Sequence, residues 1–163
     1  MKYLPFERIT YSSSFSQQEI IKRLSEVVEP KKFSFRRKPV KDYEGSVDTN
    51  SFDISRVISY RNSFLPEIHG TIQKNNDRTE IQVTMTLNGF VFVFTIAWCL
   101  ITSISFVFLL IKGIRDKGIT LEFFIPLLMM LFIYGLTMIC FKMESQKSKE
   151  YLKQIFNAEI IKE

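Results

Sequence analysis

The chain of 163 residues is 46% hydrophobic and 24% charged, with a net charge of +5 from 22 Lys and Arg against 17 Asp and Glu. An aromatic content of 14% excludes an intrinsically disordered chain. All but five of the charged residues lie in residues 1–88 or 142–163, so the middle of the chain lacks the interleaving of charge that a soluble globular protein shows. The distribution predicts a membrane protein with the length of one domain.

Residues 1–88 are expected to form a small cytoplasmic α+β domain. Tyr3 to Tyr11 alternates loosely between apolar and polar residues, which is typical of a strand. Ser16 to Glu19 has the spacing of a capping box, and apolar residues after it recur on one helical face until Pro30, which is expected to end the helix. That face consists of Ile20, Ile21, Leu24, Val27 and Val28.

A basic segment follows this helix. Its positive charges are Lys31, Lys32, Arg36, Arg37 and Lys38, interleaved with Phe33 and Phe35. Three interpretations are open: a solvated loop, a contact with anionic lipid at the membrane surface, or a nucleic-acid patch. Because the chain is expected to be tethered to a membrane, lipid contact is the functional hypothesis for these five residues, and no nucleic-acid partner is expected.

From Lys41 onward the apolar residues recur at every second position, which predicts an antiparallel meander. A short strand at Tyr43 to Val47 precedes three longer strands, and Asn75 to Arg78 is a turn by composition. The apolar faces of the longer strands are Phe52, Ile54, Ile58 and Tyr60; Phe64, Ile68 and Ile72; and Ile81, Val83, Met85 and Leu87.

Arg56 interrupts the first of these apolar faces. A guanidinium in that position either pairs with a carboxylate such as Glu44 or Glu67 or lines a polar pocket for an anionic ligand. Polar residues between Tyr60 and Pro66 are expected to form the connection to the next strand. The candidate ligand-binding residues are therefore Arg56, Tyr60, Arg61 and Asn62.

Residues 89–141 predict a transmembrane hairpin. Gly89 to Ile111 gives 23 uncharged residues and Phe123 to Phe141 gives 19, and about 20 helical residues cross a hydrocarbon core of roughly 30 Å. The charged, glycine-containing segment 112–122 connects the two spans. Small or hydroxylated residues in the spans are expected to pack the helices within the hairpin or between copies, which would give a homo-oligomer. They are Thr102, Ser103, Ser105, Gly135 and Thr137.

Both chain ends are expected on the cytoplasmic side. Six Lys and Arg flank the two spans against three in the connection between them, which favours ends inside. Residues 1–30 also contain no apolar segment that would export the basic N-terminal part. The sequence thus predicts a multi-pass protein of a cytoplasmic membrane.

Residues 142–163 are expected to form an amphipathic helix. Its apolar side consists of Tyr151, Leu152, Ile155, Phe156 and Ile160. Two resting places are open for this helix: the open face of the N-terminal sheet and the membrane surface.

The sequence favours a protein that is not an enzyme and has no metal or cofactor. There is one histidine, His69, and no Cys or His cluster with the spacing of metal ligands. Arg61 and Asn62, with His69 further on, form a loose version of the Arg-polar-x-His signature of HEPN-type ribonucleases, which makes a nuclease the enzymatic alternative. That signature belongs on a helix, whereas here it spans Pro66 in a strand-rich region.

The segment FDISRVISYRNSFLPEIHG, from Phe52 to Gly70, precedes a strand and then an aromatic-rich span. It resembles a broad group of small uncharacterised bacterial membrane proteins with the motif IxRxIxYRNSFLPxIxG ahead of two membrane helices. The resemblance runs from Tyr43 through the second span and rests on Arg56, Tyr60, Arg61, Asn62, Ser63, Phe64, Leu65, Pro66 and Gly70. It implies a bacterial inner-membrane setting and brings no activity with it.

Two functions follow as hypotheses. The first is a membrane-anchored module that binds a ligand or a protein through the region from Arg56 to Pro66. The alternative is a membrane effector whose hairpins oligomerise and perturb the bilayer when the cytoplasmic domain receives a signal.

Overall fold

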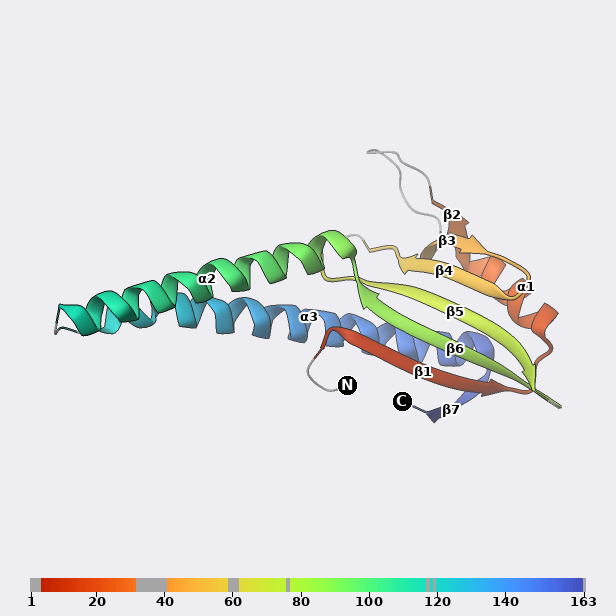
Figure 1. The fold of residues 1–163 in the computed structure, drawn as a ribbon. Helices are drawn as coiled ribbons and strands as arrows, with labels where there is room; N and C mark the ends of the chain where they lie inside the picture. The colour runs from red at the N-terminus through yellow and green to blue at the C-terminus, as the bar shows by residue number, and fades with distance from the viewer. Residues whose placement is uncertain are drawn as a thin grey trace.

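The computed structural model describes residues 4–31, 41–58, 62–75, 77–116, 118 and 120–162. They form one seven-stranded sheet, with two helices on one of its faces, and a long helical hairpin that projects from one end of the sheet (Figure 1). The elements in chain order are β1 (Phe6–Ser13), α1 (Gln17–Val27), β2 (Val28–Pro30), β3 (Tyr43–Val47), β4 (Ser51–Arg56), β5 (Pro66–Asn75), β6 (Arg78–Leu87), α2 (Gly89–Arg115), the 3-10 helix η1 (Leu121–Phe124), α3 (Ile125–Phe156) and β7 (Ala158–Lys162). The α+β prediction is therefore confirmed.

The strands lie in the order β2-β3-β4-β5-β6-β1-β7. The four strands from β3 to β6 form the predicted antiparallel meander, whereas β2 runs parallel to β3. β1 joins the far side of β6 with Phe6 opposite Thr86. β7 pairs with the other side of β1, so the first and last strands of the sheet lie side by side (Figure 1).

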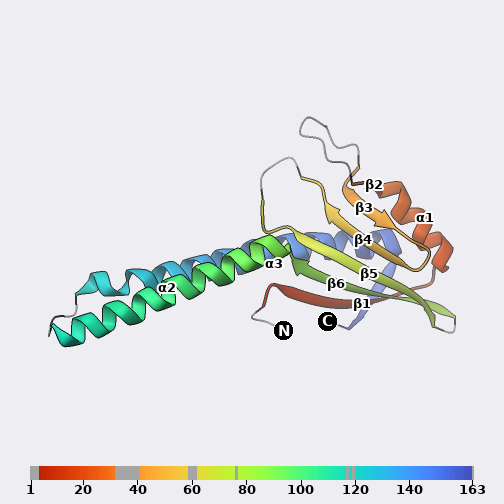
Figure 2. The same cartoon turned by 45° about the horizontal axis from the view of Figure 1, so that its top comes forward.

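The predicted alternation of apolar residues defines one buried face of the sheet. The buried strand residues include Ile9, Tyr11, Phe52, Ile54, Ile68, Ile72, Ile81, Val83, Met85 and Leu87. α1 and the second half of α3 cover this face, as Figures 1 and 2 show from two directions. The opposite face carries Thr, Ser, Gln and charged side chains, and no helix of the described residues covers it.

Two strand boundaries differ from the prediction. β4 ends at Arg56, so Ile58 lies beyond it, while Tyr60 is outside the described residues. β5 begins at Pro66, and Phe64 sits in the turn before it, partly buried against the core. An apolar residue in a turn can continue the alternating pattern of the neighbouring strand although it forms no strand hydrogen bonds, so the pattern alone places the strand boundary wrongly.

The capping box at α1 is confirmed, since the Glu19 N–H donates to Ser16 Oγ at 3.3 Å. The prediction that Pro30 ends the helix is wrong, because α1 ends at Val27 and Val28 begins β2. The Lys41 ammonium accounts for this early end, since it donates to the carbonyl oxygens of Ser25 and Val28 at 2.6 and 2.9 Å. A cation at the last carbonyls of a helix satisfies groups that would otherwise require another turn.

The hairpin consists of α2 and the first half of α3. Asn88 caps α2, with its Oδ1 accepting from Phe90 N–H at 3.0 Å, and its Nδ2 donates to Glu67 Oε1 at 2.8 Å. The segments Gly89–Arg115 and Leu121–Phe156 are both long and apolar enough to cross a membrane. Their apolar side chains lie largely uncovered by protein; the Phe108 side chain, for example, is 67% exposed.

The prediction of a separate helix over 142–163 is wrong. α3 runs from Ile125 to Phe156 without a break, so the second apolar segment continues directly into the helix that covers the sheet. The physical reason is that residues 142–150 contain neither Gly nor Pro to end the helix. Leu152 and Phe156 of the predicted apolar side are fully buried against the sheet.

The helix also ends earlier than predicted, and the chain closes with a strand. Asn157 adopts a left-handed conformation with φ 43°, which asparagine tolerates at the end of a helix. Ile160 therefore lies in β7, where it pairs with Tyr11 of β1 in the antiparallel register.

Candidate functional site

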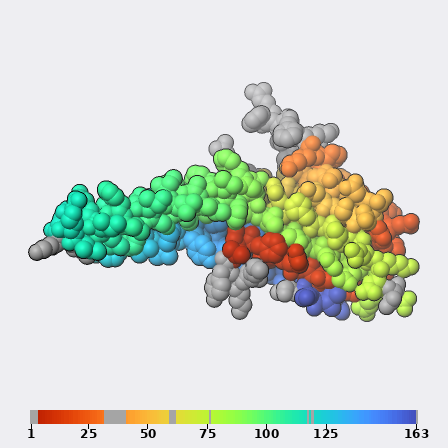
Figure 3. Space-filling model, viewed as in Figure 1, coloured from red at the N-terminus to blue at the C-terminus, as the bar shows by residue number. Residues whose placement is uncertain are grey.

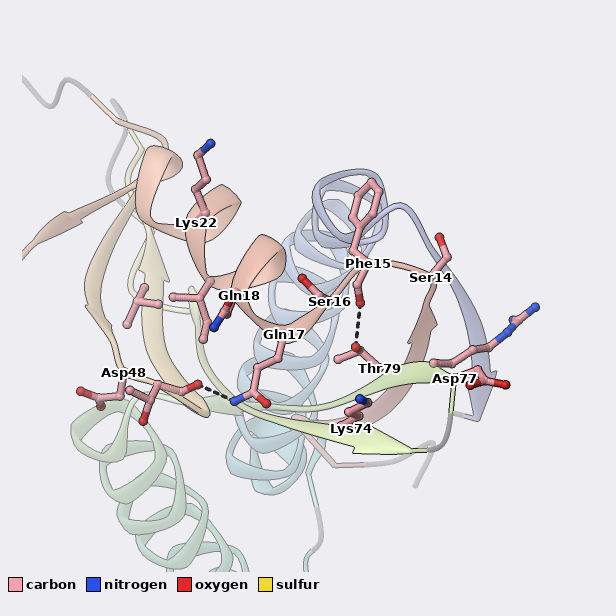
Figure 4. A pocket seen from close by; sticks show the side chains of 14 residues that line it. Ser14, Phe15, Ser16, Gln17, Gln18, Lys22, Asp48, Lys74, Asp77 and Thr79 are labelled. Atoms are coloured by element: carbon pink, nitrogen blue, oxygen red, sulfur yellow. Dashed lines mark hydrogen bonds between the residues drawn. The ribbon is translucent and has the colours of Figure 1, made fainter.

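A large hollow of about 1160 Å³ lies at the end of the sheet opposite the hairpin; we call it the distal cleft (Figure 4). It is lined by Ser14, Phe15, Ser16, Gln17, Gln18, Ile21, Lys22, Val47, Asp48, Thr49, Lys74, Asp77, Arg78 and Thr79. These residues come from the β1–α1 connection, the start of α1 and the turns β3–β4 and β5–β6. Antiparallel pairing brings these connections to one end of the sheet, so the cleft follows from the topology.

Two hydrogen bonds hold the walls of the distal cleft together. Gln17 Nε2 donates to the Thr49 carbonyl at 2.6 Å and links the start of α1 to the β3–β4 turn. Thr79 Oγ1 donates to the Phe15 carbonyl at 2.7 Å and links the β1–α1 connection to β6. Both bonds are drawn in Figure 4, and together they give the cleft a defined shape.

The charges around the distal cleft are mixed. Lys22, Lys74 and Arg78 stand against Asp48 and Asp77. In Figure 4 the Lys22 side chain points away from Lys74, so these cations do not converge on one point. The arrangement suits a polar ligand of low net charge better than a phosphate or a metal ion.

The sequence-predicted Arg56 lies outside this cleft and is engaged elsewhere. Its Nη1 lies 3.1 Å from Glu144 Oε2, and the Glu144 side chain is only 5% exposed. Lys147 Nζ lies 3.0 Å from the other oxygen of the same carboxylate. The expectation of Glu44 or Glu67 as the partner is wrong, because strand alternation puts both on the face of the sheet turned away from α3.

Most of the other residues predicted to bind a ligand or contact the membrane surface lie outside the described part of the chain. Asn62 Oδ1 accepts from Phe64 N–H at 3.0 Å within the connection predicted between β4 and β5, while Tyr60 and Arg61 lie outside the described residues. Of the basic segment Lys31 is described and exposed at the end of β2. The remaining four, Lys32, Arg36, Arg37 and Lys38, lie outside the described residues.

Sequence reasoning missed the polar contacts between α3 and the sheet. Tyr151 on α3 donates to Asp42 Oδ2, and its ring lies 5.4 Å from that of Tyr43, centroid to centroid. Burial raises the pKa of Tyr43, and burial together with the bond to Asp42 raises the pKa of Tyr151 from 10.0 to about 12. Both phenols thus remain protonated where α3 meets β3.

Replacing Tyr151 with phenylalanine is expected to change the alkaline stability of the protein. The unfolded chain loses the Tyr151 proton near pH 10, whereas the folded chain keeps it until about pH 12, so this group's contribution to stability is lost as the pH rises through that interval. The variant should lose about 1 kcal/mol below pH 10, from the missing bond to Asp42, and less additional stability between pH 10 and 12 than the wild type. Thermal unfolding in detergent across this range measures both; an identical pH slope for the two proteins would contradict the assignment.

His69 lies on the open face of the sheet. Its Nδ1 is 3.3 Å from Asp53 Oδ2, with the two side chains 49% and 64% exposed. The nuclease alternative pairs His69 with Arg61, which is outside the described residues. Within the described part of the chain no three His, Cys, Asp or Glu side chains gather to hold a metal ion.

Comparison with protein families, with curated proteins and with solved structures gave no match for this chain.

Proposed function

We propose that this protein is a membrane-anchored binding module: the α2–α3 hairpin crosses a bacterial inner membrane and the sheet presents the distal cleft to the cytoplasm. The observation that carries the proposal is the position of the cleft, which opens at the end of the sheet opposite two uncovered apolar helices. A ligand would reach such a cleft from the aqueous side without meeting lipid. Large concave surfaces that combine apolar residues with a few polar groups are the usual ligand sites of protein domains.

The composition of the distal cleft indicates what it binds. Phe15, Ile21 and Val47 supply apolar surface, and Gln17 and Ser14 supply polar groups. Cations and carboxylates occur together along its rim, so neither sign of charge is favoured strongly. A small polar molecule with an apolar part therefore fits better than a highly charged one.

Native mass spectrometry of the detergent-purified protein tests this function. Ser14 is exposed and lines the cleft, so Ser14→Trp should fill the cleft without disturbing the core, and a co-purifying small molecule should be lost. Ser46→Trp, on an exposed serine of β3 that does not line the cleft, is the matched control and should keep the molecule. Retention in both variants, or loss from both, would overturn the assignment to the cleft.

The same measurement distinguishes the second candidate, an oligomerising membrane effector. Apart from the neighbouring backbone of α3 itself, no atom of the described residues lies within 4 Å of the position that a Cβ on Gly135 would take, so this face of α3 has room to approach another helix. Ser103, in contrast, is used inside the hairpin, where its Oγ lies 3.3 Å from Met130 Sδ. A ligand-free homo-oligomer that dissociates on Gly135→Leu would favour the effector over the binding module.

A further inference from the structure

The start of β1 lies level with the base of the hairpin. Phe6 pairs with Thr86, two residues before Asn88, the N-cap of α2, and Leu4 lies in the bend that directly precedes β1. Figure 3 shows the start of β1, in red, lying against the base of the hairpin where green α2 meets blue α3. The first strand of the sheet therefore reaches the level at which the uncharged run of α2 begins.

A polar brace fixes β1 at this level. Lys142 Nζ lies 2.6 Å from Glu7 Oε1, and Ser145 Oγ donates to Glu7 Oε2 at 2.6 Å. Lys142 is the first charged residue after the uncharged run of α3. The Glu7 carboxylate is thus bound to α3 within one turn of the point where its apolar segment ends, and β1 cannot lift away from the hairpin without breaking both contacts.

Three exposed apolar side chains from different elements occur at this level; we call them the collar. They are Leu4 before β1, 49% exposed, Phe90 in the first turn of α2, 81% exposed, and Met143 next to Lys142, 57% exposed. The 23 uncharged residues from Gly89 to Ile111 extend over about 35 Å, against a hydrocarbon core of roughly 30 Å. If the hairpin spans the membrane, the collar therefore lies at the boundary between the acyl chains and the headgroups.

We propose that the collar is a lipid contact, through which the sheet itself rests on the membrane surface in addition to being tethered by the hairpin. The inference rests on the proposed membrane-spanning hairpin. It names the bilayer as the occupant, because Phe90 and Met143 belong to the two helices that would cross it and Leu4 is exposed beside the strand that is bound to α3 at this level. Leu4 is the decisive member, since it belongs to the sheet and not to either span.

Tryptophan fluorescence tests the contact, because Trp98 is the only tryptophan of the chain. In a Trp98→Phe background, Leu4→Trp is compared with Ile161→Trp in phosphatidylcholine vesicles whose acyl chains carry bromine near the headgroup end. Ile161 is the matched control: it is 62% exposed and lies on β7, whose Lys162 pairs with Thr10, about 20 Å along β1 from Leu4. We expect at least twofold quenching and a blue-shifted emission for Leu4→Trp, and neither for Ile161→Trp. Equal, weak quenching of the two would overturn the inference.

A measurement on the wild-type protein shows whether weak quenching of Leu4→Trp means that the collar does not contact lipid or that the hairpin does not span the membrane. Trp98 lies about 14 Å along α2 from Gly89, near the centre of a bilayer, so vesicles with bromine deep in the acyl chains should quench it. Quenching of Trp98 without quenching of Leu4→Trp would support the membrane-spanning hairpin and overturn only the proposal that the collar contacts lipid. Absence of Trp98 quenching would contradict the proposal that the hairpin spans the membrane. Met143→Trp in the Trp98→Phe background should respond like Leu4→Trp, which guards against a fold defect peculiar to one variant.

Discussion

Replacing Phe156 with alanine is expected to lower the free energy of unfolding by about 3 to 5 kcal/mol, the usual cost of removing a fully buried phenylalanine. Phe156 ends α3, is 0% exposed, and its ring centroid lies 5.7 Å from that of Tyr11 and 6.0 Å from that of Phe52. Its side chain therefore fixes the end of a helix that begins in the hairpin to the centre of the sheet. Chemical denaturation in detergent, followed by circular dichroism, measures the loss.

Ile161→Ala is the control for this prediction. Ile161 is an apolar residue of β7 close to Phe156 in sequence, but it is 62% exposed, and substitutions of such residues usually change stability by no more than about 0.5 kcal/mol. If Phe156→Ala were as stable as Ile161→Ala, the end of α3 would not be docked on the sheet as described.

Gly45→Ala is expected to cost about 3 kcal/mol. Gly45 has φ +150°, and a Cβ there would lie 2.0 Å from the Asp53 carbonyl oxygen of the neighbouring strand β4. Both the strained backbone and the clash with main-chain atoms oppose the side chain, and neither is relieved by a rotamer change. Thermal unfolding in detergent should show a transition several degrees below that of the wild type.

Gly89→Ala provides the comparison at a glycine with free space, since no described atom beyond its own stretch of α2 lies within 4 Å of the position of an added Cβ. Its stability should stay within about 0.5 kcal/mol of the wild type. If Gly45→Ala were as stable as Gly89→Ala, the strands β3 and β4 would not approach each other as closely as described here.

The local parts of this fold were predictable from the sequence, and the parts that depend on distant partners were not. The alternation from Ile81 to Leu87 and the capping residue Ser16 act within their own elements, so they predicted β6 and the start of α1 directly. The strand β7 is short and forms only because β1, from the other end of the chain, offers it an edge. Its one local signal was Asn157, a residue that favours the end of a helix.

The candidate site shows the same division. The turn at Asn75 to Arg78 and the helix start at Ser16 were both predicted, but their meeting in the distal cleft follows from the strand order. Arg56 was correctly recognised as a charge among apolar neighbours, whereas its contact Glu144 lies 88 positions away. The apolar periodicity of a strand carries no information about a partner in the second half of α3, which follows the hairpin in the chain.

The placement of α3 and β7 has a consequence for biosynthesis. A ribosome completes β1 to β6 before either hairpin helix, but Phe141, Leu152 and Phe156, which cover the sheet, leave it afterwards. Until then the nascent sheet exposes its apolar face and one edge of β1, a state that is prone to aggregation and is recognised by chaperones. The water-exposed part would thus complete its folding only after the hairpin has been synthesised. A chain whose hairpin fails to insert would remain incompletely folded and susceptible to degradation.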